Sequence, residues 1–208
     1  MKKDIASILK KLQEMHGKPR VELSYSNPLE LVIATVLSAQ CTDARVNEVT
    51  AALFKEYKKA RDYAAADPAA LEEEIRSTGF YKNKTKSVIA CCMKLMADFR
   101  GEVPRTLEEL MTLPGVGRKT ANMVLGNAFG VPAIAVDTHV QRVSNRLGLA
   151  HSDNPQAVEE ALMRQVANDR WTAFGNAMIL HGRETCIARK PHCPECVLRE
   201  VCEWPDKT

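Results

Sequence analysis

The sequence of 208 residues predicts an all-α fold. Apolar residues recur at helical spacing nearly throughout, and no segment shows the strict alternation of a half-buried strand. Short connectors rich in glycine, proline and asparagine separate the helical segments, as expected where helices start and end. Aromatic residues make up only 5% of the chain, while alanine, leucine and charged residues, which favour helices, dominate.

Local capping signals place the helices in order. Asparagine, aspartate and threonine side chains accept hydrogen bonds from the first N–H groups of a helix, and proline suits its first position. The first helix carries an apolar face from Ile5 to Met15 and ends before Gly17. Later helices are expected to begin at Asn27-Pro28, at Thr42 or Asp43, at Asp67-Pro68, after Asn83, at Thr106, at Lys119, at Asp137, at Asn154-Pro155 and near Asp169.

Composition favours a soluble protein of the cytoplasm. Charged residues form 26% of the chain and the net charge is +3. No run approaches the roughly 18 apolar residues of a membrane span, and Met1-Lys2-Lys3-Asp4 leads into a charged amphipathic segment rather than a secretory signal. The mild positive charge is compatible with nucleic acid but does not by itself point to it.

Four of the seven cysteines gather near the C-terminus, and this grouping predicts a metal site. Six, two and five residues separate Cys186, Cys193, Cys196 and Cys202. Four thiolates hold either tetrahedral zinc or an iron–sulfur cluster, and the wide first gap favours [4Fe–4S]. That gap contains Arg189 and Lys190, which either contact phosphate or form a solvated basic loop. The remaining three, Cys41, Cys91 and Cys92, are expected within apolar helical segments.

The chemistry is expected in the stretch from Leu113 to His139. Gly115 and Gly117, followed by Arg118 and Lys119, predict a tight turn that opens a helix and offers N–H groups to an anion. No strand precedes the turn and the P-loop spacing is missing, so the fitting motif is a helix–hairpin–helix that grips nucleic-acid phosphate. A simple helix–helix connector would not require two glycines and two cations in five residues.

Lys119 has two interpretations, and so has Asp137. The field at a helix start favours the neutral amine that Schiff-base chemistry requires, although Lys119 could also be a second phosphate contact. Asp137 follows the apolar segment from Val131 to Val136, which could return the chain to the lysine. Its carboxylate could transfer a proton or stabilise positive charge on a sugar, or it could simply cap a helix.

Together these motifs resemble the endonuclease III family of DNA base-excision glycosylases over nearly the whole chain. The resemblance rests on the four-cysteine pattern and on three segments, Ser38–Asp43, Leu113–Ala121 and Val136–His139. It implies a two-lobed helix–hairpin–helix glycosylase fold with a cleft between the lobes. Residues 22–133 would form a six-helix barrel domain, and residues 1–21 with 134–208 a [4Fe–4S] cluster domain.

The resemblance also implies an activity. A damaged nucleotide is flipped out of double-stranded DNA, Lys119 attacks the sugar and forms a Schiff base, β-elimination cuts the strand, and Asp137 is its catalytic partner. The implied substrates are oxidised pyrimidines and abasic sites, handled by a monomer. The expected DNA contacts are Gln40, Phe80, Gly115, Val116, Gly117, Arg118, His139, Arg189 and Lys190. Gln40 would fill the gap left by the flipped base, and Phe80 stands where the family more often has an aliphatic residue.

Two other functions compete with this interpretation. Monofunctional glycosylases of the same superfamily resemble the chain in hairpin and cluster, but carry another residue where Lys119 stands. A non-catalytic DNA-binding module would use the hairpin alone. The pairing of Lys119 with Asp137 argues against the first alternative, and the full set of motifs argues against the second.

Overall fold

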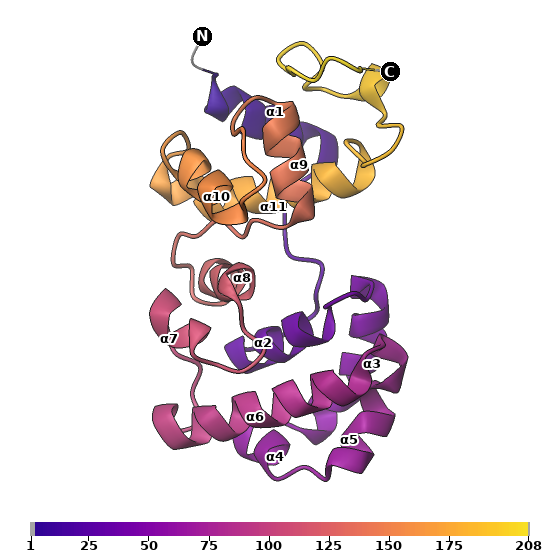
Figure 1. The fold of residues 1–208 in the computed structure, drawn as a ribbon, viewed down its shortest axis with the longest axis vertical. Helices are drawn as coiled ribbons and strands as arrows, with labels where there is room; N and C mark the ends of the chain where they lie inside the picture. Colours follow the sequence, from indigo (N-terminus) through magenta and orange to yellow (C-terminus); the bar gives the residue numbers. More distant parts are fainter. Residues whose placement is uncertain (1–2, 208) are drawn as a thin grey trace. The chain divides into compact units, whose positions relative to one another are not determined.

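A computed structural model describes residues 3–207, which contain only helical elements and no strand. These residues form eleven α-helices and three short 3-10 helices (Figure 1). The all-α prediction is therefore confirmed. Among the described residues no helix is long and apolar enough to cross a membrane.

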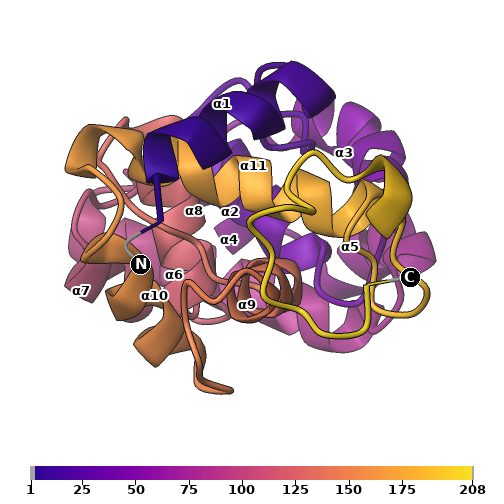
Figure 2. The ribbon, with the colours of Figure 1, turned by 90° about the horizontal axis from the view of Figure 1, so that it is seen from above.

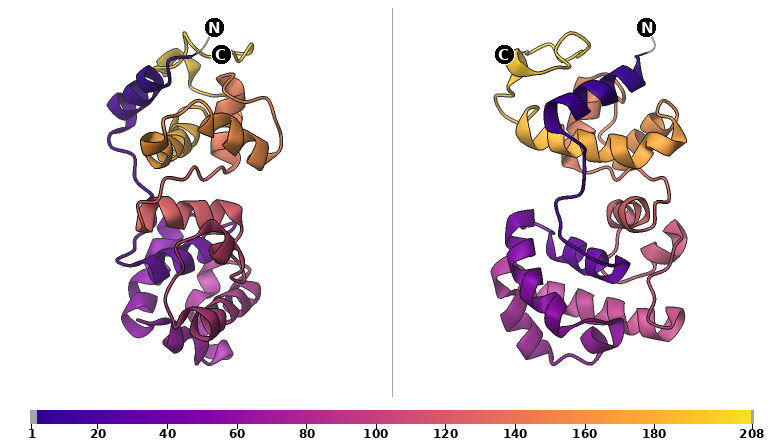
Figure 3. Two further views of the ribbon diagram at one scale, coloured as in Figure 1. Left: turned by 90° about the vertical axis from the view of Figure 1, so that its left-hand side faces the viewer. Right: turned by 180° about the vertical axis from the view of Figure 1, so that it is seen from behind.

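Residues 21–130 form one compact unit. The long helix α6 packs against α4 and α5, and α2 packs against α3, α6 and α8 (Figure 3). The helices of this unit are α2 Pro28–Leu37, α3 Asp43–Glu56, α4 Ala60–Ala64, α5 Pro68–Ile75, η1 Arg76–Thr78, α6 Tyr81–Phe99, α7 Leu107–Met111 and α8 Arg118–Ala128. Helix α2 is buried along nearly its whole length, which makes it the centre of this unit.

The second compact unit combines the two ends of the chain, up to residue 20 and from residue 131. Helix α11 contacts both α1 and α9, and Figure 2 shows it between them. The helices of this unit are α1 Ile5–His16, α9 Thr138–Arg146, α10 Pro155–Met163, η2 Asn168–Arg170, α11 Trp171–Glu184 and η3 Cys193–Glu195. Lys3 Nζ pairs with Glu203 Oε1 at 3.0 Å, so the two ends of the described chain are also joined directly.

Most helices begin where the capping signals predict. The side chains of Asn27, Asp67 and Asn154 each accept from an N–H in the first turn, with proline at the first helical position. Thr42, Thr106 and Asp137 cap α3, α7 and α9 in the same way. Capping is a local interaction between residues two or three apart, so the sequence alone was sufficient to find it.

Two expectations about local structure were wrong, and one helix was missed. Helix α6 begins at Tyr81, after a left-handed Phe80, rather than after Asn83. The five-residue α4 was not predicted, because a segment of that length shows no apolar period and its N-cap residue is a lysine. Cys41 lies in the turn between α2 and α3 and not within a helix.

The two cysteines of α6 belong to the core and should be chemically inert. Cys91 and Cys92 are fully buried, and burial raises the pKa of the Cys91 thiol to about 12. At pH 8 the thiolate is then about one part in ten thousand. We expect an alkylating reagent to label half-buried Cys41 in the native protein, and Cys91 and Cys92 only after denaturation. Peptide mass spectrometry checks this, and labelling of Cys91 as fast as Cys41 in folded protein would contradict it.

Candidate functional site

The turn between α7 and α8 exposes both of its glycines. Gly115 has φ +79, and a side chain there would come within 3.0 Å of the Ser87 Cβ, so both backbone and packing require glycine. At Gly117, by contrast, φ is −92 and a Cβ would meet nothing within 4 Å. Since nothing in the fold requires glycine at Gly117, the open space leaves room for a ligand to approach the backbone closely.

This turn offers unpaired donors. The N–H groups of Gly115, Gly117 and Lys119 make no hydrogen bond to any residue in the described range 3–207. Val116 differs, because its side chain is buried and its N–H donates to the Leu113 carbonyl at 3.0 Å. Free N–H groups at a helix start suit an anion such as a phosphate.

Three residues that the sequence identified separately line one concavity of residues 21–130: Gln40, Phe80 and Gly115. Gln40 and Phe80 both have left-handed backbones, with φ 53 and φ 48. Such conformations cost non-glycine residues about 1–3 kcal/mol and are found at functional sites. The Phe80 side chain is 64% exposed. Two strained residues beside the glycine turn are consistent with a surface that receives a ligand.

Lys84, which the sequence analysis did not single out, holds the two strained turns together. Its ammonium donates to the Leu37 carbonyl at the end of α2 and to the Thr78 carbonyl at the end of η1, both at 2.7 Å. Lys84 is only 5% exposed. Burial lowers its pKa, and the nearby Cys41 thiol partly offsets that effect. One buried cation thereby fixes the segments that lead into Gln40 and Phe80.

Replacing Lys84 by methionine should destabilise the protein by about 2–4 kcal/mol, because two carbonyls lose the buried ammonium that donates to them. Lys82→Met on the exposed face of the same helix is the matched control and should change the free energy of unfolding by less than about 0.5 kcal/mol. Urea denaturation of both variants measures this. A Lys84→Met protein as stable as the control would show that water replaces the ammonium.

Lys119 is the second residue of α8 and is half-buried. Within the described chain its side chain makes no hydrogen bond or ion pair. No acidic residue lies in the first turn of this helix. Lys119 therefore directly follows the free N–H groups of the glycine turn in sequence, and its side chain has no partner among residues 3–207.

Asp137 caps α9 in the other unit. Its Oδ1 accepts from the N–H groups of His139 and Val140, both at 2.8 Å. The cap interpretation of Asp137 is thus correct, and its second carboxylate oxygen makes no hydrogen bond within residues 3–207. His139 is half-buried, and its Nδ1 lies 3.1 Å from an Arg142 guanidinium nitrogen.

The four C-terminal cysteines line one cavity. They form no disulfides. Arg146, only 8% exposed, shapes the loop, because its guanidinium donates to the carbonyls of Ile187 and Ala188 at 2.8 and 2.9 Å. It also lies 3.3 Å from the Cys186 sulfur and 4.7 Å from the centre of the Trp204 ring. Such an arginine stabilises negative sulfur while it holds the chain around the cavity.

Arg142, one turn earlier on α9, supports the same loop. It donates to the Cys186 carbonyl at 3.0 Å and to the Gly182 carbonyl at 2.7 Å. The basic residues of the loop, Arg189 and Lys190, are exposed, and Lys190 has a left-handed backbone with φ 54. Arg189 and Lys190 are therefore exposed to solvent on a loop whose backbone is held by hydrogen bonds from the arginines of α9.

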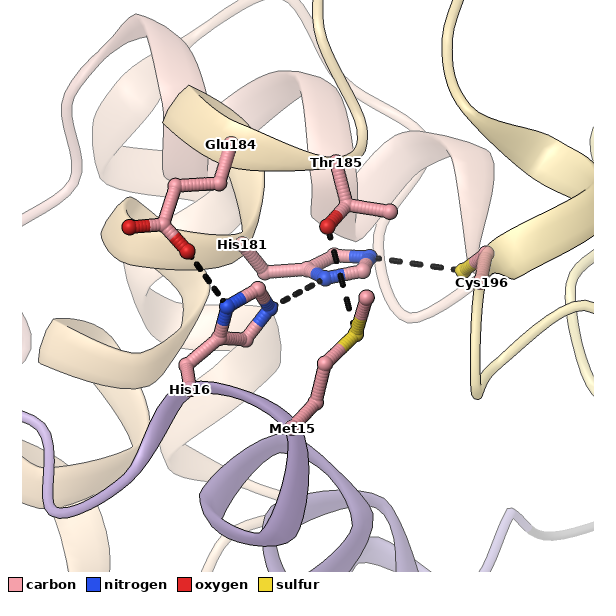
Figure 4. A network of polar contacts seen from close by, with 6 residues as sticks. All are labelled: Met15, His16, His181, Glu184, Thr185 and Cys196. Carbon is pink, nitrogen blue, oxygen red and sulfur yellow. Dashed lines mark hydrogen bonds and ion pairs between the residues drawn. The ribbon is translucent and has the colours of Figure 1, made fainter.

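His181 also lies against the cysteine site, and its contacts are those of a buried structural histidine. It is 1% exposed, and its Nε2 lies 3.5 Å from the Cys196 sulfur (Figure 4). Burial, followed by the charge of His16, lowers the pKa of His181 to about 4. Its ring is therefore neutral at physiological pH, and its single proton is on whichever nitrogen the neighbours favour.

The donor set fits a thiolate-bound group. Four free thiols face one cavity, and a guanidinium and an imidazole lie within reach of two of the sulfurs. In the described part of the chain no three histidine, cysteine or acidic side chains are grouped as one metal ion requires.

The residues that the sequence analysis missed are Lys84, Arg142, Arg146 and His16. Each acts through contacts with distant parts of the chain, which a reading of local pattern does not reveal. One signal was present for the two arginines: they occupy positions i and i+4 of a helix whose neighbouring residues, Val143 and Leu147, are core residues. Cations on the inner side of a short helix indicate buried acceptors.

Comparison with known proteins defines the class. The model for the HhH-GPD superfamily of base excision DNA repair proteins matches residues 33–168, more than half of the chain. Endonuclease III of Bacillus subtilis is 49% identical over 206 residues, covering 99% of this chain and 94% of that protein.

Two solved structures are similar at 48% identity and a TM-score of 0.92, each covering 97% of this chain and 95% of the other. One is a non-covalent endonuclease III–DNA complex, and the other a trapped endonuclease III–DNA covalent intermediate. The chain belongs to the endonuclease III family of base excision DNA repair enzymes.

Proposed function

We propose that this enzyme removes oxidised pyrimidines from double-stranded DNA and cuts the resulting abasic strand through a Schiff base on Lys119. The single observation that supports it most is the half-buried, unpaired Lys119 beside the exposed N–H groups of Gly115 and Gly117. A phosphate held by the turn would bring the neighbouring sugar within reach of the amine. A relative at 48% identity has been trapped covalently on DNA.

The chemistry assigned to these residues is as follows. The neutral amine of Lys119 attacks C1′ of the sugar, and the damaged base leaves with a proton. Opening of the sugar ring gives an imine, which acidifies the C2′ hydrogens. Loss of one of these protons expels the 3′ phosphate and cuts the strand. Water then releases Lys119. Asp137, with one carboxylate oxygen unused by its cap, stabilises the positive charge on the sugar and transfers protons.

The remaining candidate residues hold the DNA. Gln40 and Phe80 occupy the gap left by the flipped nucleotide, and their shared concavity supports this role. Gly117, Arg118, Arg189 and Lys190 contact phosphates, and His139 lies close to the strand at the start of α9. For Val116 the role is to support the turn from below, because its side chain is buried. We place the enzyme in the cytoplasm, acting as a monomer.

For the cysteine site we propose a [4Fe–4S] cluster held by Cys186, Cys193, Cys196 and Cys202. A cluster bound there would stabilise the conformation of the basic loop that contains Arg189 and Lys190. Four thiols that line one cavity support it. Iron and acid-labile sulfide in anaerobically purified protein test this proposal, and stoichiometric zinc without iron would overturn it.

A panel of duplexes tests the activity. Duplexes with thymine glycol or an abasic site should be cut, and borohydride should trap the protein on abasic DNA. An undamaged duplex should be neither cut nor trapped with the protein. Base release without strand cutting would instead make the enzyme monofunctional. Binding without either reaction would reduce it to a DNA-binding module.

A further inference from the structure

Helix α6 contributes Lys84 to the concavity that Gln40, Phe80 and Gly115 also line. Ser87, about one turn further along this helix, lies against the glycine turn, because a Cβ at Gly115 would lie 3.0 Å from the Ser87 Cβ. The Lys84 ammonium binds the segments that lead into Gln40 and Phe80. One stretch of α6 therefore supports all three segments of the chain that meet at this concavity.

Lys84 holds the two residues before α6 from both sides. Its ammonium donates to the Thr78 carbonyl at 2.7 Å, and its backbone N–H donates to the Phe80 carbonyl at 3.1 Å. Between these contacts Gly79 and Phe80 both have positive φ, 71 and 48. Such a backbone is costly for phenylalanine and persists only where the surrounding structure enforces it. The contacts of Lys84 supply this constraint, and they fix the backbone from which the exposed Phe80 side chain projects.

The same ammonium also binds the segment that carries Gln40. It donates at 2.7 Å to the carbonyl of Leu37, the last residue of α2. The last carbonyls of a helix have no partner within it, so a side chain that binds one sets how the chain leaves the helix. Gln40 follows three residues later, in a turn that the Cys41 N–H closes by donating to the Ser38 carbonyl at 3.1 Å. Gln40 and Phe80 are thereby linked, through short segments, to one nitrogen atom.

We propose that Lys84 is a positioning residue for nucleotide flipping: it sets the spacing between Gln40 and Phe80, so that both side chains enter the gap together when a damaged nucleotide leaves the stack. The inference rests on the gap-filling role proposed above and extends it to a buried residue that acts through the other two. A side chain that is already in place at binding costs less ordering free energy than one that must be fixed there. Lys84 therefore lowers the cost of filling the gap and leaves the attack on the sugar to other residues.

The size of the effect depends on how much stacking the substrate loses. Extruding a base that is still paired and stacked costs more than extruding a sugar that carries no base, and inserted side chains offset that cost. Loss of Lys84 should therefore slow the release of a paired damaged base and affect the cutting of an abasic site much less. A lysine that only stabilised the fold would affect both reactions alike, because both need the same folded enzyme and the same Lys119.

The test compares two substrates under single-turnover conditions with the full chain. In Lys84→Met, base release from thymine glycol paired with adenine should fall by about 10-fold or more relative to strand cutting at a pre-formed abasic site. Leu95→Ala is the control for stability, because it opens a cavity at a fully buried position near the other end of α6. Lys82→Met, at an exposed position of the same helix, is the control for charge. Both controls should keep the wild-type ratio of the two rates.

A mutant cycle shows whether Lys84 acts through the two side chains. When Gln40→Ala and Phe80→Ala are both present, adding Lys84→Met should change the ratio by less than about 2-fold, whereas independent effects would multiply. Lys84→Gln, which keeps two N–H donors on a shorter side chain, should lie between wild type and Lys84→Met, and it takes the place of Lys84→Met in the cycle if that protein does not fold. A wild-type ratio in the folded Lys84 variant, or a multiplied loss in the triple variant, overturns the inference. A wild-type enzyme that releases no thymine glycol overturns the proposed function instead, which is a separate result.

Discussion

Lys119→Ala should give a folded protein that still binds abasic DNA but is no longer trapped by borohydride and no longer cuts the strand. Because the variant lacks the amine that forms the imine in the proposed mechanism, the rate of cutting should fall by about 1,000-fold or more. Single-turnover cleavage of an abasic duplex measures the loss. Lys10→Ala, at an exposed lysine of α1, is the control and should be trapped like wild type.

The same variant should not lose stability, and this separates a nucleophile from a structural lysine. Lys119 has no side-chain partner in the described chain, and a cation at a helix start opposes the helix dipole. Its removal should therefore leave the free energy of unfolding unchanged or raise it by up to about 1 kcal/mol. Undiminished trapping by Lys119→Ala would assign the imine to another amine. A marked loss of stability would instead show that Lys119 holds the hairpin together.

The features that could be predicted from the sequence are those that depend on interactions between residues close together in the chain. Asn27, Asp67 and Asn154 act on N–H groups two or three residues away, so their helices were predicted at the right residue. The glycine turn is similarly local. Phe80 is the instructive failure, because it takes a left-handed backbone that a bulky residue disfavours. The residues next to Phe80 in the sequence do not indicate this conformation. The start of α6 was therefore predicted after Asn83, although the helix begins at Tyr81.

The sequence identified the individual residues of the candidate site, but not which of them lie close together in space. Gln40, Phe80 and Gly115 were identified one by one, and only the fold reveals that they share a concavity. Lys84 makes the point most clearly, since its two acceptors lie 47 and 6 residues away. A lysine in a helical segment is ordinarily exposed to solvent. Only tertiary packing buries Lys84, where its ammonium links two segments of the chain by hydrogen bonds.

Asp137→Asn should separate the two roles of this residue. The cap uses only Oδ1, which accepts from two N–H groups, and an asparagine oxygen can accept both in the same way. The variant should therefore lose less than about 1 kcal/mol of stability, from the missing charge at the helix start. It also loses the anion that stabilises positive charge on the sugar and accepts protons. Base release under single-turnover conditions should fall by about 100-fold or more.

Asp137→Ala completes the comparison, because it removes cap and charge together. Its activity should match that of Asp137→Asn, while it should be about 1 kcal/mol less stable than Asp137→Asn through loss of the cap. The measurements are urea denaturation and single-turnover base release for all three proteins. Wild-type activity in Asp137→Asn would reduce Asp137 to a helix cap. Activity that followed stability across the series would show that α9, and not the carboxylate, matters for the reaction. Only a slow but stable Asp137→Asn protein supports the catalytic role, because it separates the charge from the fold.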